Sequence, residues 1–174
     1  TDLDYSSSIM CDDYLQTYKD VSTLSSYFHE KWLENNIAGL SSYKEFFMLS
    51  NEQRLINIST AGRISHILAK SEKFALDHRN SDNPDAAGEF SQHISSRENL
   101  DLLAEEEHIR WAEDRKKLGW KKGKTRSDYF KIHPLIETQY MELLEVDKEK
   151  DRKQIRNYPA TLKDSEFKII TVQE

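Results

Sequence analysis

The sequence predicts a mainly helical chain with a minor β component. Charged residues make up 32% of its 174 residues, and it contains only five glycines and three prolines. This composition favours helices over a turn-rich sandwich or barrel. Apolar side chains recur at three- and four-residue spacing in several segments, and one short segment near the C-terminus reads as a strand. We therefore expect one compact, largely helical unit.

The N-terminal part is expected to contain an acidic arm followed by a helical extension. Residues 1–22 are polar and acidic with scattered tyrosines, which predicts a partly ordered arm. The extension covers residues 23–77. Its first helix runs to about Asn36, because four apolar side chains share one helical stripe: Leu24, Tyr27, Phe28 and Trp32.

Two further helices are predicted within the extension. Ser41 and Ser42 are suited to cap a short helix that carries aromatic side chains over residues 43–47. Asn51 is a good N-cap for a longer helix, whose broad apolar face continues to about Phe74.

A polar stretch, residues 78–96, separates the extension from a second unit, residues 97–174. The stretch contains Pro84 and Gly88 as helix breakers, and it is long for a connection inside a compact domain. We therefore expect it to be a loop that marks a subdomain boundary.

The second unit opens with a strong helix predicted from Arg97 to about Leu118. Ser96 is suited to cap its start, and Gly119 to stop it. A basic turn and an irregular stretch follow. We then expect a helix over about residues 147–162 and a closing strand over 167–172.

The charge of the chain is unevenly distributed. The formal net charge is −6, which argues against a general nucleic-acid binder. Between Arg110 and Arg126, however, eight basic residues face two acidic ones, so this window carries +6 and the remainder −12. The window is therefore a candidate anion-binding region.

The single cysteine and the lack of a long apolar stretch indicate where in the cell the chain works. Cys11 allows no internal disulfide and no cysteine-based zinc cluster, and its acidic neighbours Asp12 and Asp13 would raise its pKa and keep it inert. No stretch approaches the roughly 20 apolar residues that cross a bilayer. We expect a cytoplasmic chain without direct membrane contact.

A candidate ligand site follows from helical spacing. His108, Trp111 and Arg115 are three and four residues apart, so they share one face of the predicted helix. A tryptophan one turn from an arginine suits a planar base with an attached anionic group. The alternative is that Trp111 is simply a core residue.

One set of motifs is specific in order and spacing: Leu103-Ala104-Glu105-Glu106-Glu107-His108-Ile109-Arg110-Trp111, Gly119-Trp120-x-x-Gly123, Asp128, Lys131, His133-Pro134 and Asp151-Arg152. With these motifs, the segment from Leu100 to Tyr158 closely resembles the RyR domain. That module is named for repeats in the ryanodine receptor calcium channels and is also found in many bacterial proteins. The resemblance implies a helical module that binds a ligand and is not an enzyme.

The resemblance also implies which ring holds the ligand. In the channel repeats an adenine nucleotide stacks on the tryptophan of the His-x-x-Trp helix, which corresponds to Trp111. Those repeats occur as tandem pairs, whereas this chain has one copy. The second ring is expected either from Trp120 or Tyr129 in the same chain or from a second copy in a homodimer. Bacterial modules of this kind tend to follow membrane segments or a TrkA-type Rossmann domain, which is compatible with a chain that begins in mid-protein.

The expected ligand-binding residues are His108, Trp111, Arg115, Trp120, Lys121, Lys122, Arg126, Tyr129 and His133. The lysines and Arg126 would receive phosphates as point charges, although a solvated charged face is the alternative. His108 has packing as its alternative, and His133 the shaping of a turn. Asp151 and Arg152 are expected to be structural, as ion-pair partners that anchor the last helix. No cofactor and no metal are expected.

The sequence is compatible with three functions. The leading one is a regulatory sensor for a small molecule, a nucleotide or nucleotide-like metabolite, that controls an effector elsewhere. The second is a protein-interaction or oligomerisation module that uses the stripe with Tyr27, Phe28 and Trp32 or the basic face. The third is a metal-dependent hydrolase built on Glu105, Glu107 or His108 with His133, but the chain has no His-Glu-x-x-His pattern.

Overall fold

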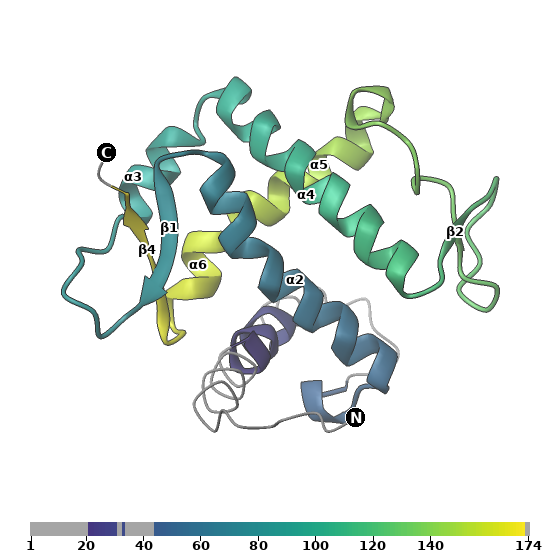
Figure 1. Ribbon diagram of the computed structural model, residues 1–174, viewed down its shortest axis with the longest axis horizontal. Helices are drawn as coiled ribbons and strands as arrows, with labels where there is room; N and C mark the ends of the chain where they lie inside the picture. Colours follow the sequence, from purple (N-terminus) through teal and green to yellow (C-terminus); the bar gives the residue numbers. More distant parts are fainter. Residues whose placement is uncertain (1–20, 31–32, 34–43, 173–174) are drawn as a thin grey trace, which may run out of the picture.

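The computed structural model describes residues 21–30, 33 and 44–172 (Figure 1). Several sequence predictions lie outside these residues: the arm up to residue 20 with Cys11, and Trp32, Asn36, Ser41 and Ser42. The described chain is mainly helical with a minor β component, as the sequence predicted. Within it, no helix has both the length and the apolar character needed to cross a membrane.

The first predicted helix is present, and it begins inside the predicted arm. Residues 21–30 are helical, with Leu24 and Phe28 buried. Phe28 packs edge-on against Tyr158 at 6.1 Å between ring centroids. This part of the aromatic stripe faces the core. Phe28 therefore cannot contribute to the docking surface that was considered for a protein-interaction module.

The predicted short helix is a 3-10 turn, η2 (Phe46–Met48), and the long helix is α2 (Asn51–Lys70). Ser50 rather than Asn51 caps α2. The Ser50 hydroxyl accepts the backbone N–H of Gln53, and the Gln53 side chain accepts the backbone N–H of Ser50, which satisfies two otherwise unpaired donors.

Helix α2 ends four residues before Phe74, where the sequence had suggested that it would continue. The Ser71 hydroxyl accepts the backbone N–H of Phe74 at 3.2 Å, and Glu72 has a positive φ of 58°. Both features interrupt the helical hydrogen-bond ladder. Strand β1 (Phe74–His78) follows and pairs antiparallel with β4 (Phe167–Thr171), the strand predicted at the C-terminus.

The predicted loop over residues 78–96 contains a helix, α3 (Ala87–His93). It forms because Phe90 is fully buried and packs edge-on against Phe74 at 5.3 Å. The Asp85 carboxylate accepts the backbone N–H of Ala87 at the start of the helix. Burial of one aromatic ring therefore orders a segment whose composition is typical of a loop.

The helix predicted from Arg97 is α4 (Arg97–Lys117), the longest described helix. Ser96 occupies the N-cap position without a side-chain cap bond, and Gly119 ends the helix with a φ of 86°. The segment beyond α4 projects from the helices as a long loop (Figure 1), called here the hairpin-like projection because the chain runs out and returns. It contains two short strands, β2 (Lys121–Lys122) and β3 (Ile132–His133), which pair in parallel.

The single helix predicted over 147–162 is two helices, α5 (Glu145–Arg156) and α6 (Tyr158–Lys163), preceded by the 3-10 turn η3 (Tyr140–Glu142). Pro159 explains the break, because it has no N–H to continue the helical ladder. Helices α2 and α5 both pack on α4 (Figure 1). One hydrophobic core joins residues of α2, such as Ile64, to residues of α4 and α5, such as Leu103 and Ile155.

Candidate functional site

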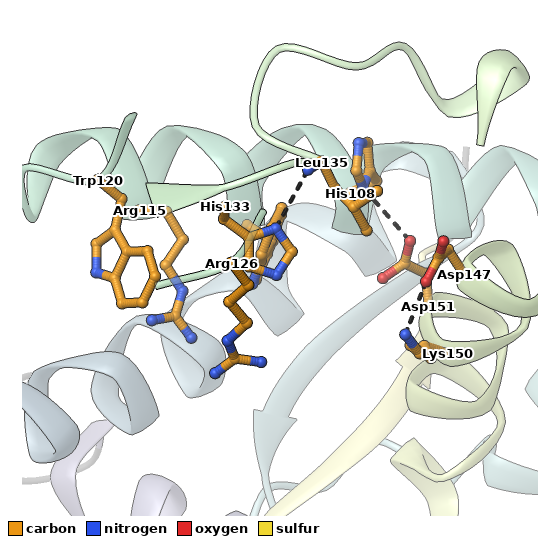
Figure 2. Close-up of a pocket in the computed structure, with 10 residues that line it drawn as sticks. His108, Arg115, Trp120, Arg126, His133, Leu135, Asp147, Lys150 and Asp151 are labelled. Atoms are coloured by element: carbon orange, nitrogen blue, oxygen red, sulfur yellow. Dashed lines mark hydrogen bonds and ion pairs between the residues drawn. The ribbon is translucent and has the colours of Figure 1, made fainter. Parts of the chain in front are cut away.

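A cavity of about 240 Å³ opens where α4, the basic turn and α5 meet (Figure 2). Six of the nine predicted site residues line it: His108, Trp111, Arg115, Trp120, Arg126 and His133. The shared helical face predicted from spacing is therefore one wall of a hollow. Four further lining residues had not been predicted: Leu135, Asp147, Lys150 and Asp151.

Aromatic rings form the floor of the cavity. The His133 ring contacts both tryptophans: its centroid lies 4.9 Å from that of Trp111 and 6.4 Å from that of Trp120. His108 stacks on Trp111 at 5.7 Å with an interplanar angle of 25°. Trp120 is buried and Trp111 is half-buried, so Trp111 keeps exposed ring surface for a planar ligand.

Arg115 is a cation with no anionic partner in contact with it in the described part of the chain. Its guanidinium carbon lies 4.9 Å from the Trp120 ring centroid and 6.0 Å from that of Trp111. Among the described residues, the Arg115 guanidinium makes no hydrogen bond or ion pair. Burial, followed by the charges of Arg126 and Arg63, lowers the pKa of Arg115 from its ordinary value. These influences disfavour its positive charge, and a bound anion would offset them.

His108 connects α4 to the neighbouring segments. Its Nε2 donates to the carbonyl oxygen of Thr138 at 2.9 Å, because a carbonyl can only accept. Its Nδ1 lies 3.6 Å from Oδ2 of Asp151. Burial lowers the pKa of His108, but hydrogen bonding and charge from Asp151, with the Thr138 carbonyl, outweigh burial and raise it.

This geometry predicts a pH-dependent stability that depends on Asp151. Because the folded state raises the pKa of His108, the stabilisation is present below the unfolded value of about 6.5 and is lost as pH rises through the folded pKa. The substitution Asp151→Asn should remove this dependence. Melting temperatures of the wild-type and Asp151→Asn proteins, measured from below pH 6.5 to alkaline pH, test this prediction. The two curves of melting temperature against pH should converge as the pH rises, and parallel curves would contradict the prediction.

His133 is held in its neutral form. The backbone N–H of Leu135 donates to its Nδ1 at 3.2 Å, so the proton of the neutral ring is on Nε2. Burial first, and then the charges of Arg126 and Arg115, lower the pKa of His133. The ring therefore contributes an uncharged aromatic surface beside Trp111, in addition to shaping the turn.

Three predicted residues do not line the cavity. Lys121 and Lys122 are exposed on β2, where Lys122 donates to the carbonyl of Glu137 at 3.4 Å. Tyr129 is 89% exposed and packs edge-on against its neighbour Phe130. The solvated alternative therefore describes these two lysines better than a role in the cavity.

The lining residues on α5 have a sequence signal that was missed. Lys150 and Asp151 lie three and four residues after Asp147, about one helical turn on, so both are on the same side of the helix as Asp147. Asp151 was expected to be an ion-pair partner that anchors the last helix; it does lie 3.6 Å from His108, and it also borders the cavity. Arg152 is structural as expected: it is 2% exposed and donates to Asp101 at 2.5 Å.

The residues considered for a metal-dependent hydrolase are brought together only in part: His108 and His133 both line the cavity, but Glu105 and Glu107 do not. Glu107 is buried and bonds to Arg63 rather than facing His108 or His133. Glu105 borders a second hollow, which His108 also lines but His133 does not. In the described part of the chain, no three His, Cys, Asp or Glu side chains lie close enough to hold a metal ion.

Residues 90–171 match the family model of the RyR domain. The match runs from within α3 to the last residue of β4 and so includes every residue that lines the cavity. It also contains the shorter segment, Leu100 to Tyr158, that carried the resemblance. A comparison with curated proteins found no match.

Proposed function

Because the chain contains an RyR domain at residues 90–171, we propose that this domain is a non-catalytic sensor for a nucleotide or nucleotide-like metabolite. The ligand binds in the cavity between α4 and α5. In this proposal the protein works in the cytoplasm, and the bound state controls an effector elsewhere in the polypeptide or complex.

The observation that carries the proposal is an arginine side chain that has no ion-pair partner within residues 21–30, 33 and 44–172 and lies beside partly exposed aromatic surface. A base would stack on Trp111, next to the neutral His133 ring, and a phosphate would meet Arg115. Both tryptophans that line the cavity come from one chain, which supports a site that does not need a second copy. Arg126 also borders the cavity, but Asp128 already accepts its hydrogen bonds at 2.8 and 3.2 Å.

The proposal predicts that Arg115→Gln weakens nucleotide binding about ten-fold or more, because hydrogen bonds to charged groups contribute roughly 1.5–3 kcal/mol. Isothermal titration with AMP and GMP measures the affinity. Arg110→Gln is the matched control, since Arg110 is on the same helix, pairs with Glu106 and does not line the cavity. Equal affinities for the two variants would contradict an anion subsite at Arg115.

A second candidate, a protein-interaction module, rests on exposed apolar side chains near the start of α2. Phe47 is 75% and Leu55 50% exposed, and both border one shallow hollow. Light scattering with and without nucleotide separates the two candidates. A stable dimer that no nucleotide changes favours interaction, and a monomer that binds nucleotide favours the sensor.

A further inference from the structure

Two hydrogen-bond acceptors face each other at one end of the cavity. Because Nε2 of His108 donates to Thr138, Nδ1 of the neutral ring carries a lone pair. Nδ1 lies 3.6 Å from Oδ2 of Asp151, which is longer than a normal N–H···O bond. With the ring neutral, the pair lacks a donor.

The two ends of the cavity carry side chains of opposite charge. Figure 2 shows Arg115 and Arg126 on one side of His133, and Asp147 and Asp151 on the other. Between the two ends lie His133 (Figure 2) and the ring of Trp111, whose centroid is 6.0 Å from the Arg115 guanidinium carbon and 5.7 Å from the His108 ring. A ligand that spans the cavity therefore meets cations at one end and carboxylates at the other.

At each end of the cavity, ion pairs within the protein occupy some of the charged side chains and leave one charged side chain available for a ligand. Lys150 donates to Asp147 at 2.7 Å, and Asp128 accepts the hydrogen bonds of Arg126. Arg115 keeps no partner within the described chain. Asp151 has only His108 nearby as an ion-pair partner there, and this contact requires a protonated ring.

We propose that Asp151 determines ligand specificity in this cavity by selecting an aromatic ring that carries an amino group on the edge opposite its anionic group. This inference rests on the proposed function. The amino group has two hydrogens, so one can be donated to the Asp151 carboxylate and the other to Nδ1 of His108. The anionic group then lies at Arg115, and the ring stacks on Trp111 between the two ends.

The test compares two nucleotide pairs that differ in one amino group. AMP is compared with purine riboside monophosphate, which lacks the 6-amino group, and GMP with IMP, which lacks the 2-amino group. Each pair keeps the same phosphate and a ring of the same size. Titrations at alkaline pH keep His108 neutral, so that the ligand has to supply the donor.

The wild-type protein is expected to bind at least one amino-bearing nucleotide about ten-fold more tightly than its partner. Asp151→Ala should abolish this preference, so that the two members of each pair bind with similar affinity. Asp151→Asn, which keeps one acceptor oxygen, should restore part of the preference. Glu149→Ala is the control, because Glu149 is on the same helix and does not line the cavity.

The outcomes separate this inference from the proposed function. If the wild-type protein binds all four nucleotides without preference, or if Asp151→Ala and Asp151→Asn both keep the full preference, Asp151 is not the specificity determinant and the sensor proposal stands. If none of the four binds, the sensor proposal fails and the role of Asp151 fails with it. A melting temperature close to that of the wild type shows that a variant is folded.

Discussion

Replacing Arg63 with methionine is expected to lower the free energy of unfolding by about 3–5 kcal/mol, as expected when one partner of a buried ion pair is removed. Arg63 on α2 contacts two carboxylates of α4. It bonds to Glu107 through Nη2 at 2.7 Å and Nε at 3.2 Å, and to Asp114 through Nη1 at 2.9 Å. The side chains of Arg63 and Glu107 are only 8% and 6% exposed, so the substitution leaves a buried carboxylate without a cation.

A matched control joins the same two helices at the surface. Lys70 on α2 lies 4.0 Å from Glu106 on α4, and its side chain is 48% exposed. Lys70→Met should cost no more than about 1 kcal/mol, the range of exposed ion pairs. Urea unfolding measures both variants, and equal losses would show that the Arg63 contacts are not structurally important.

The stability lost in Arg63→Met should also depend on pH. Burial raises the pKa of Glu107, and Arg63 opposes this effect in the native protein. Without Arg63 the pKa rises further, so Glu107 takes up a proton more readily as the pH falls. The stability deficit of Arg63→Met should therefore be largest at neutral pH and shrink in acid, where the carboxyl is neutral in both folded and unfolded chains.

Arg63 also bears on the extent of the folded unit. The family match begins at residue 90, yet Arg63 and β1 lie before it. Strand β1 is the only pairing partner of β4 among the described residues, and Ile64 of α2 is fully buried in the common core. A chain that began at residue 90 would expose this apolar surface, so the helical extension and the RyR domain stabilise each other.

The part of the site that lies on α4 could be predicted because helical periodicity is local. His108, Trp111 and Arg115 fall on one face wherever the helix packs, and the structure places all three in the cavity. The stop at Gly119 is also local, since a φ of 86° is accessible mainly to glycine. The neighbouring Trp120 could therefore be expected near the same site.

The features that were missed depend on contacts between distant segments. From their own sequence, the residues of β1 could continue the preceding helix. They form a strand because they pair with β4, about ninety residues later in the chain. Helix α3 depends on the burial of Phe90, which its own sequence does not reveal. Asp151 borders the cavity because of the way α5 packs on α4, and the exposure of Tyr129 depends on how the hairpin-like projection stands off the core.

Trp111→Ala is expected to weaken nucleotide binding by about 1–3 kcal/mol, the range for stacking of a base on an aromatic ring. Trp111 is half-buried and borders the cavity, so the loss of stability should stay below the roughly 3–5 kcal/mol of a fully buried aromatic residue. Trp120→Ala is the comparison: Trp120 is 7% exposed, so its removal should destabilise the fold more than that of Trp111.

Trp111→Phe separates stacking from packing at the same position. Phenylalanine keeps an aromatic face beside His133, so it should retain part of the affinity that alanine loses. Titration with AMP and thermal unfolding of the same three proteins measure both quantities. If Trp111→Ala binds AMP as tightly as the wild type while its melting temperature falls as far as that of Trp120→Ala, Trp111 is a core residue and the base stacks elsewhere. If the affinity falls and the melting temperature changes little, the exposed face of Trp111 is the surface on which the ligand ring lies.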